Sequence, residues 1–425
     1  MHGVEIKRLE RYDRTIVAPP DKSISVRAVI FNSYASGSST IKNLSLCDDV
    51  KSAVACMRAL GARIELDGNT AHITGTGGAF ADCELDCGNS ATLARLLIGL
   101  LSGVRGRFVV RGDASLSKRP FKRLTDILRS AGARIQDSGD GLPITIIGGA
   151  LTGLDTVTPV ASAQIKSALL LAGLNAGGTT RVTERESTRD HTEIMLEAMG
   201  ADVCKCGTTT EISASGLTAA DITMPGDISS AAYPLCLALS VPNGKCTVKN
   251  TGVNKTRTGL LEILRGSGAS VEARNYTDCA EPFCDVTVRN DGNLSALEIP
   301  SENLSGIIDE IPAMAALACR LRGDTFLPLP EELKHKETDR TANIVRMLKS
   351  CGADFSVQSA GVLIKGGGAP VYCTVDPDGD HRIAMAAAVA TASGAGGFIV
   401  GGDCASVSYP DFYGEVIGEK NCFAR

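Results

Sequence analysis

MRALGARIEL, at residues 57–66, is the first of five related stretches in this 425-residue chain. The others are LRSAGARIQ (128–136), LEAMGADV (196–203), LRGSGASVEA (264–273) and LKSCGADFSV (348–357). In each, a Gly follows a helix-like segment, where it supplies the left-handed conformation that ends a helix, and a strand-like segment comes next. The recurrence predicts an α/β module of roughly 70 residues, whose marker glycines are Gly61, Gly132, Gly200, Gly268 and Gly352.

A second segment, rich in Ala and Leu with a polar start, recurs six times between these stretches. Helices that are apolar nearly all round are buried. Each repeat is therefore expected to contain one buried and one half-exposed helix, interleaved with short strands such as TIKNL and RFVVRG. The six copies begin with DKSISVR (21), GNSATLAR (88), SAQIKSALL (162), GDISSAAY (226), IDEIPAMA (308) and GDHRIAM (379).

Six such modules bury their helices best as two groups of three. We predict one three-repeat domain at residues 20–225 and another at residues 1–19 and 226–425, with VEIKRL as the first strand of the latter. Pro19 and Pro20 forbid helix continuation and stiffen the chain. Hinge segments are therefore expected near residues 18–21 and 224–228.

Composition excludes several classes of protein. Lys and Arg number 43 against 48 Asp and Glu, and the resulting net charge of −5 does not suit a general nucleic-acid binder. The chain shows neither a signal peptide nor an apolar run of about 18 residues, so we expect a cytoplasmic protein that does not enter membranes. The 15 Cys and 5 His show no metal-site spacing, which predicts reduced thiols and no metal.

Several buried helices start with a cation or an amide beside Ser, as at Lys22-Ser23, Asn89-Ser90 and Ser162-Ala163-Gln164. Free backbone N–H groups and the helix dipole make such starts suitable for anions. Ser, Asn and Asp are also ordinary N-caps, so for any one helix both interpretations stay open. Six such starts in a two-domain chain favour ligand binding.

Charged residues at two further helix starts are candidates for chemistry. Asp380, His381 and Arg382 open an Ala-rich helix, where the helix dipole disfavours a cation unless an anion joins it. Asp309 and Glu310 open another, and a carboxylate beside cations is a candidate base.

Two clusters contain most of the remaining cations of interest. SLSKRPFKR contains Lys118, Arg119, Lys122 and Arg123, and ELKHKETDR contains Lys336, Glu337 and Arg340. In the second cluster the spacing lets Lys336 and Glu337 share a face with Arg340 as a helix starts. Surface ion pairing, worth little energy, is the alternative interpretation.

These motifs resemble the 5-enolpyruvylshikimate-3-phosphate synthase family along nearly the whole chain. PPDKSISVR resembles the family's K-S-x-S-x-R motif, CGNSATLAR resembles G-N-[SA]-G-T, and SLSKRP resembles its Arg-Pro segment. Further motifs follow in the family's order: ASAQIKSALLLAGL, STRDHTE, PGDISSAAY, IDEIPAMA, KETDR, DHRIAM and SYPDFY.

The resemblance implies a two-domain inside-out α/β barrel of six βαβαββ repeats, the enolpyruvyl transferase fold, which closes on its substrates at a double hinge. It also implies an activity: transfer of the enolpyruvyl group of phosphoenolpyruvate to the 5-hydroxyl of shikimate 3-phosphate, with release of phosphate. This reaction belongs to the shikimate pathway of aromatic amino-acid biosynthesis and uses no metal or organic cofactor. We expect a monomer whose partners are these two small molecules.

The resemblance further implies two sets of binding residues, and both ligands are anions that guanidinium groups suit. Those for shikimate 3-phosphate would be Lys22, Ser23, Arg27, Ser162, Ala163 through its backbone, Gln164, Arg189, Asp309 and Lys336. Those for phosphoenolpyruvate would be Lys22, Asn89, Ala91, Arg119, Gln164, Glu337, Arg340 and Arg382.

The implied chemistry is addition followed by elimination, which needs a base, an acid and charge stabilisation. Asp309 is assigned to the attacking hydroxyl and Glu337 to the methyl group that forms. The charge-stabilising residues would be Lys22, Arg119, Arg340 and Arg382. Which of Asp309, Glu337 and Lys22 moves each proton stays open.

Three positions depart from the family pattern. Ala91 stands where the family usually has Gly, and its methyl group would intrude on phosphoenolpyruvate or on the longer inhibitor glyphosate, so reduced glyphosate sensitivity is expected. Val407 stands where some members have Lys, which puts one phosphate contact in doubt. Val26 replaces an Asn or His within K-S-x-S-x-R, and we expect it to be tolerated.

Two alternatives explain part of the pattern. UDP-N-acetylglucosamine enolpyruvyl transferase shares the six-unit architecture, but its first motif resembles K-N and it usually has a Cys where this chain has SLSKRP. A non-catalytic repeat scaffold would explain the periodicity but not the charged residues at the starts of buried helices.

Overall fold

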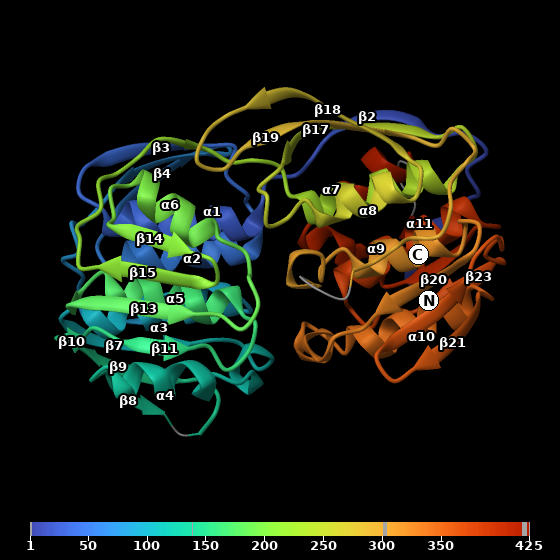
Figure 1. Ribbon diagram of the computed structural model, residues 1–425. Coiled ribbons are helices and arrows are strands. Elements are labelled where there is room, and N and C mark those ends of the chain that lie inside the picture. Colours follow the sequence, from blue (N-terminus) through green and yellow to red (C-terminus); the bar gives the residue numbers. More distant parts are fainter. Residues whose placement is uncertain (1, 138, 301–303, 419–422, 425) are drawn as a thin grey trace. The chain divides into compact units, whose positions relative to one another are not determined.

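A computed structural model describes residues 2–424 except 138, 301–303 and 419–422. The chain divides into two compact units (Figure 1). Unit 1 comprises Met1–Pro19 and Pro225–Arg425, and unit 2 comprises Pro20–Met224. Within the described ranges, every cysteine is a free thiol, and no helix is both long and apolar enough to cross a membrane.

Glycine ends five of the more exposed helices, as the recurring stretch predicts. The residue after each helix cap is a Gly with φ between 68° and 110°, a conformation that costs other residues more. A strand begins two or three residues later. The helices are α2 (Asp48–Ala59), α4 (Lys122–Ser130), α6 (His191–Ala198), α8 (Gly259–Gly266) and α10 (Arg340–Ser350). The prediction from Gly61, Gly132, Gly200, Gly268 and Gly352 is confirmed.

Unit 2 has three four-stranded sheets with one shared topology: a parallel pair continues into two antiparallel strands. The first is β16 (Ile222–Thr223), β3 (Ser38–Lys42), β5 (Thr70–Thr74) and β4 (Arg63–Asp67). The second is β6 (Cys83–Asp86), β7 (Gly106–Arg111), β9 (Ile144–Gly148) and β8 (Arg134–Asp137). The third is β11 (Asp155–Val157), β13 (Thr179–Thr183), β15 (Thr209–Ser213) and β14 (Val203–Cys206). A short parallel pair joins β10 (Leu151–Thr152) to β12 (Ala176–Gly177).

Unit 1 also has three sheets, and two of them draw strands from residues 1–19. The first is β18 (Ser270–Thr277), β19 (Phe283–Arg289), β17 (Lys245–Gly252) and β2 (Asp13–Val17). The second is β20 (Asp324–Pro328), β22 (Gly361–Lys365) and β21 (Asp354–Gln358). The third is β23 (Cys373–Val375), β24 (Gly397–Val400), β1 (Gly3–Ile6) and β25 (Phe423–Ala424).

The six Ala- and Leu-rich segments form the buried helices of the two hydrophobic cores. They are α1 (Lys22–Tyr34), α3 (Ala91–Gly103) and α5 (Ala163–Gly173) in unit 2, and α7 (Ile228–Ser240), α9 (Ile311–Ala318) and α11 (His381–Ser393) in unit 1. In unit 2, β13 and β15 cover α5 (Figure 1). Small residues let these helices approach closely, since a Cβ at Gly99 of α3 would lie 2.1 Å from the carbonyl oxygen of Ala168.

The last repeat differs from the expectation of a half-exposed helix in every repeat. It has a 3₁₀ segment at Gly402–Val407 and a π-helical turn at Tyr413–Ile417 instead of an α-helix. Pro410 removes a backbone donor and Gly414 weakens helical preference, so the intervening residues cannot propagate an α-helix. Tyr413, Val416 and Ile417 are nevertheless buried in the core of unit 1.

Candidate functional site

The start of α1 in unit 2 places Lys22 and Ser23 in its first turn. Asp21 is the N-cap, because its Oδ1 accepts a hydrogen bond from the backbone N–H of Ile24 at 2.8 Å. The Nζ of Lys22 lies 3.3 Å from Oδ2 of Asp49. Both Lys22 and Ser23 are half-buried, so a cation is held at a helix start where an anion would also be stabilised.

Arg27, one turn further along α1, is only 4% exposed. Its Nε donates to Oγ1 of Thr192 at 2.8 Å and its Nη2 to Oγ of Ser167 at 3.2 Å. Its Nη1 donates to the carbonyl oxygen of Ser23 at 3.0 Å. Arg27 therefore connects α1 to α5 and α6 within unit 2.

Three residues that are predicted to bind phosphoenolpyruvate lie together at the start of α3. Ser90 is the N-cap, which matches the ordinary capping interpretation for that hydroxyl. Nδ2 of Asn89 donates to Oδ2 of Asp113 at 2.6 Å, and Oδ1 of Asn89 accepts from Nη2 of Arg119 at 2.9 Å. Ala91 is the first helical residue and is 7% exposed.

The start of α5 is connected to α3 through Gln164. Nε2 of Gln164 donates to Oγ1 of Thr92 at 2.9 Å, and Oε1 accepts from Nη1 of Arg95. Ser162 is the N-cap through its Oγ, and Ala163 opens the helix. The structure thus brings the predicted residues of α3 and α5 together in unit 2.

Arg95 is a residue that sequence reasoning missed, although it lies in the CGNSATLAR motif. Its guanidinium stands over the ring of Phe121, 5.2 Å from the centroid, and Nη2 donates to the carbonyl oxygen of Pro120 at 3.3 Å. Burial, with Arg119 and Arg123 nearby, lowers the pKa of Arg95 to about 10. A cation near the start of an apolar helix was the available sign, the same one that drew attention to Arg382.

Arg340, the first residue of α10, is the centre of the charged cluster in unit 1. It is 1% exposed. Nε lies 2.8 Å from Oδ2 of Asp380, Nη1 lies 3.2 Å from Oδ1 of Asp309, and Nη2 pairs with Glu337. Burial lowers the pKa of Arg340, but Glu337 and Asp380 outweigh it and raise that pKa above its usual value. Three carboxylates thus share one buried guanidinium.

Asp309 gathers the remaining cations of this cluster. Its Oδ1 is 3.3 Å from Nζ of Lys336 and 3.9 Å from Nε of Arg382, and its carbonyl oxygen accepts from Nη1 of Arg382 at 3.4 Å. Burial lowers the pKa of Arg382, but the Asp309 carboxylate reverses this and raises that pKa well above its usual value. The structure therefore brings all five predicted residues of unit 1 together: Asp309, Lys336, Glu337, Arg340 and Arg382.

Asp380 is the N-cap of α11, because its Oδ1 accepts a hydrogen bond from the backbone N–H of Arg382 at 2.9 Å. Its carboxylate is the anion that the helix dipole favours at this helix start. Asp380 is fully buried and is committed to this cap and to Arg340. His381 is 4% exposed, and burial together with Arg382 lowers its pKa to about 3. Its surroundings therefore favour the neutral form of His381 near pH 7.

The cluster can perform acid–base chemistry on an anionic substrate. Lys336, Arg340 and Arg382 supply positive charge, while Asp309 and Glu337 retain some exposure, with side chains 10% and 36% exposed. Carboxylates are candidate acids and bases, and these two lie beside the cations that would bind an anionic substrate. Val407, by contrast, is an apolar residue that is 53% exposed and offers no charge to a phosphate.

A second buried pair in unit 1 joins Glu310, which the sequence marks as a helix-start carboxylate, to Arg257, which sequence reasoning missed. Glu310, next to Asp309, is fully buried, and its Oε1 lies 3.0 Å from Nη2 of Arg257 and accepts from Oγ of Ser229. Glu310 is 81 residues from Ser229 and 53 from Arg257 in the sequence, so no local spacing indicates these contacts. Among the residues that the structure describes, no group of three or more His, Cys, Asp or Glu is placed to hold a metal ion.

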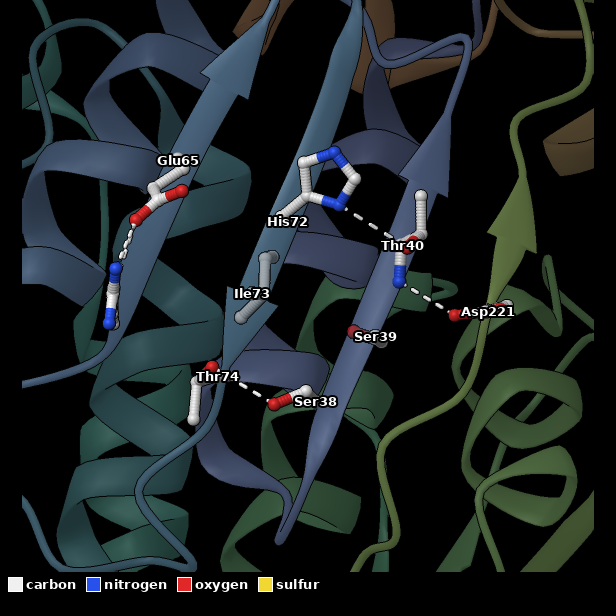
Figure 2. A pocket seen from close by; sticks show the side chains of 9 residues that line it. Ser38, Ser39, Thr40, Glu65, His72, Ile73, Thr74 and Asp221 are labelled. Atoms are coloured by element: carbon white, nitrogen blue, oxygen red, sulfur yellow. Dashed lines mark hydrogen bonds and ion pairs between the residues drawn. The ribbon is translucent and has the colours of Figure 1, made fainter.

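A hollow of about 400 Å³ lies on the outer face of the sheet formed by β16, β3, β5 and β4 (Figure 2). Its polar groups pair with one another: His72 with Thr40, Ser38 with Thr74, and Oδ1 of Asp221 with the backbone N–H of Thr40 at 2.6 Å. None of its described lining residues is a predicted site residue. We therefore place the candidate site at the helix starts and not in this hollow.

Comparison with known proteins identifies the family. The family model described as EPSP synthase (3-phosphoshikimate 1-carboxyvinyltransferase) matches residues 6–416. The 3-phosphoshikimate 1-carboxyvinyltransferase of Shouchella clausii is 44% identical over 407 residues, covering 94% of each chain. That of Bacillus subtilis is 42% identical, covering 93% of this chain and 94% of the other.

Solved structures give the same result for the fold. The EPSP synthase from Acinetobacter baumannii has a TM-score of 0.89 at 34% sequence identity, and the comparison covers 100% of this chain and 99% of that one. The expected enolpyruvyl transferase fold is confirmed. With a family model that matches nearly its whole length and relatives above 40% identity, the chain belongs to the EPSP synthase family.

Proposed function

We propose that this chain is a transferase that moves the enolpyruvyl group of phosphoenolpyruvate to the 5-hydroxyl of shikimate 3-phosphate and releases phosphate. The observation that carries the proposal is the cluster around Arg340, where two partly exposed carboxylates lie among three cations. Such a cluster suits a reaction between two anionic substrates in which the acceptor hydroxyl loses a proton and a carbon of the donor gains one. The family relatives named above support the same reaction.

In the proposed mechanism, Asp309 takes the proton of the attacking 5-hydroxyl. Glu337 transfers protons to and from the carbon that becomes a methyl group. A tetrahedral phosphoketal forms, and loss of a proton from its new methyl group together with loss of phosphate then gives the enolpyruvyl product. Lys22, Arg119, Arg340 and Arg382 stabilise the negative charge that develops on the donor. Arg340 and Arg382 are suited to this role because their neighbours keep them charged.

We further propose the binding roles implied by the family motifs. Shikimate 3-phosphate would be bound by Lys22, Ser23, Arg27, Ser162, Ala163, Gln164, Arg189, Asp309 and Lys336. Phosphoenolpyruvate would be bound by Lys22, Asn89, Ala91, Arg119, Gln164, Glu337, Arg340 and Arg382. We also propose residues 18–21 and 224–228, where the chain crosses between the units, as the hinge.

A phosphate-release assay tests this function. With shikimate 3-phosphate and phosphoenolpyruvate both present, we expect saturable phosphate release that persists in EDTA and stops when either substrate is omitted. Release with UDP-N-acetylglucosamine as the acceptor would favour the related transferase instead. Folded protein that binds neither substrate in calorimetry would favour the repeat scaffold.

The methyl group of Ala91 is proposed to reduce sensitivity to glyphosate. Removing it in Ala91→Gly should relieve an overpacking cost of about 1–3 kcal/mol, which corresponds to a glyphosate half-inhibitory concentration lower by about 5- to 150-fold. The measurement is inhibition of phosphate release at fixed phosphoenolpyruvate. Ala94→Gly, a buried position one turn further along α3, controls for the weaker helix. Equal glyphosate sensitivity in the parent and Ala91→Gly would contradict the proposal.

A further inference from the structure

A fully buried ion triad lies beneath the candidate residues of unit 2. Nζ of Lys166, on α5, is 2.8 Å from Oε2 of Glu184 and 2.7 Å from Oε1 of Glu193. The exposed fractions of the three side chains are 0%, 1% and 5%. Burial lowers the pKa of Lys166, but the two carboxylates outweigh it and raise that pKa above its usual value. Since desolvating three charges is costly, the triad is best explained by a geometry that it enforces.

Glu184 and Glu193 differ in their contacts beyond Lys166. Glu184 follows β13 and accepts two further hydrogen bonds from Thr188: one from the backbone N–H at 3.4 Å and one from Oγ1. Glu193 lies within α6. Glu184 thus connects Lys166 to Thr188, which lies in the short segment between β13 and α6.

The residue that follows Thr188 is Arg189, a proposed ligand of shikimate 3-phosphate. On its other side, Oδ2 of Asp190 lies 3.1 Å from Nζ of Lys205. Thr188 is only 3% exposed, while Arg189 is half-buried. The backbone on the N-terminal side of Arg189 is therefore held by Glu184.

The same triad is adjacent to the other proposed ligands of shikimate 3-phosphate. Ser167, the neighbour of Lys166, accepts from Nη2 of Arg27 at 3.2 Å and from Oγ1 of Thr192 at 2.7 Å. The helix that holds Lys166 also presents Ser162 and Gln164 at its start. One buried network thus supports α1, α5 and the segment before α6.

We propose that Glu184 is a positioning residue that, by holding Thr188 against Lys166, fixes Arg189 for binding shikimate 3-phosphate. This inference rests on the proposed function and adds to it a residue that does not touch substrate. Glu193 balances charge in the same triad but pairs with Lys166 from within α6.

Two matched variants separate these roles. Glu184→Met and Glu193→Met each remove one buried carboxylate and leave Lys166 paired with the other. We expect Glu184→Met to raise the Kd of shikimate 3-phosphate, measured by titration calorimetry, and its KM by about tenfold or more, as suits the loss of charge-assisted hydrogen bonds. The kcat and the KM of phosphoenolpyruvate should stay within about threefold, and Glu193→Met should bind shikimate 3-phosphate within about threefold of the parent.

A milder variant keeps the test decisive if Glu184→Met does not fold. Thr188→Val replaces only the hydroxyl group by a methyl group and should raise the same Kd, whereas Thr188→Ser keeps the hydroxyl group and should leave that Kd close to the parent's. Equal effects of Glu184→Met and Glu193→Met, or parent-like affinity in Thr188→Val, would overturn the inference. A parent protein without phosphate release would refute the proposed function instead, so the two failures are distinguishable.

Discussion

Asp309→Asn should lower kcat by about 10²- to 10⁴-fold, the usual contribution of a positioned acid or base. Asn preserves the size of the side chain and can still accept from Lys336 and Arg340, but it cannot take a proton from the substrate hydroxyl. The KM values should change far less than kcat. Steady-state phosphate release with both substrates varied provides the measurement.

The control for Asp309→Asn is Asp354→Asn in the same unit. Asp354 is also paired with a lysine, since its Oδ2 lies 3.5 Å from Nζ of Lys365, but its side chain is 71% exposed. We expect parent-like kcat from this control. If Asp309→Asn kept kcat within threefold of the parent while remaining folded, Asp309 would not be the base.

Arg340→Met should destabilise unit 1 by about 3–5 kcal/mol, because it leaves buried carboxylates without their cation. Asp380 is the most affected, since it is fully buried and lies 2.8 Å from Nε of Arg340. Urea unfolding followed by circular dichroism measures the loss. Activity should disappear as well, because the cluster loses its central charge.

Two further variants test the cause of that loss. Arg346→Met, on the same helix, removes an arginine that is 56% exposed and lies 3.3 Å from Asp378, and it should change stability by no more than about 0.5 kcal/mol. Adding Asp380→Asn to Arg340→Met removes the negative charge of the fully buried Asp380, which Arg340→Met leaves without its cation. The Asn side chain still caps α11. The double variant should recover part of the stability, and additive losses would contradict this explanation.

Local patterns predicted most of the fold. The five glycines and the six apolar helix segments each act through residues that are neighbours in sequence, so their structural effect can be read without knowing the fold. The misfit of Arg382 at a helix start was also local, and it led to the cluster around Asp309.

The parts that could not be predicted depend on contacts between residues that are far apart in the sequence. Arg95 meets Gln164 only because α3 and α5, from different repeats, pack together. Lys166 meets Glu184 and Glu193 only because α5, the end of β13 and α6 pack together within one repeat. The start of α10 differs slightly from the prediction that Lys336 and Glu337 share a helix face with Arg340. Asp339 is the N-cap, so Lys336 and Glu337 precede the helix, yet Glu337 still pairs with Arg340 and Lys336 reaches Asp309.

The discontinuous sequence of unit 1 has a consequence for biosynthesis. Unit 2 is one stretch and is complete once residue 224 has been translated, so it can fold while the ribosome is still at work. β2 must wait for β17 at Lys245–Gly252, and β1 for β24 at Gly397–Val400. Until then these two strands expose unpaired edges that can pair wrongly. Demand for chaperones during synthesis should therefore fall mainly on unit 1.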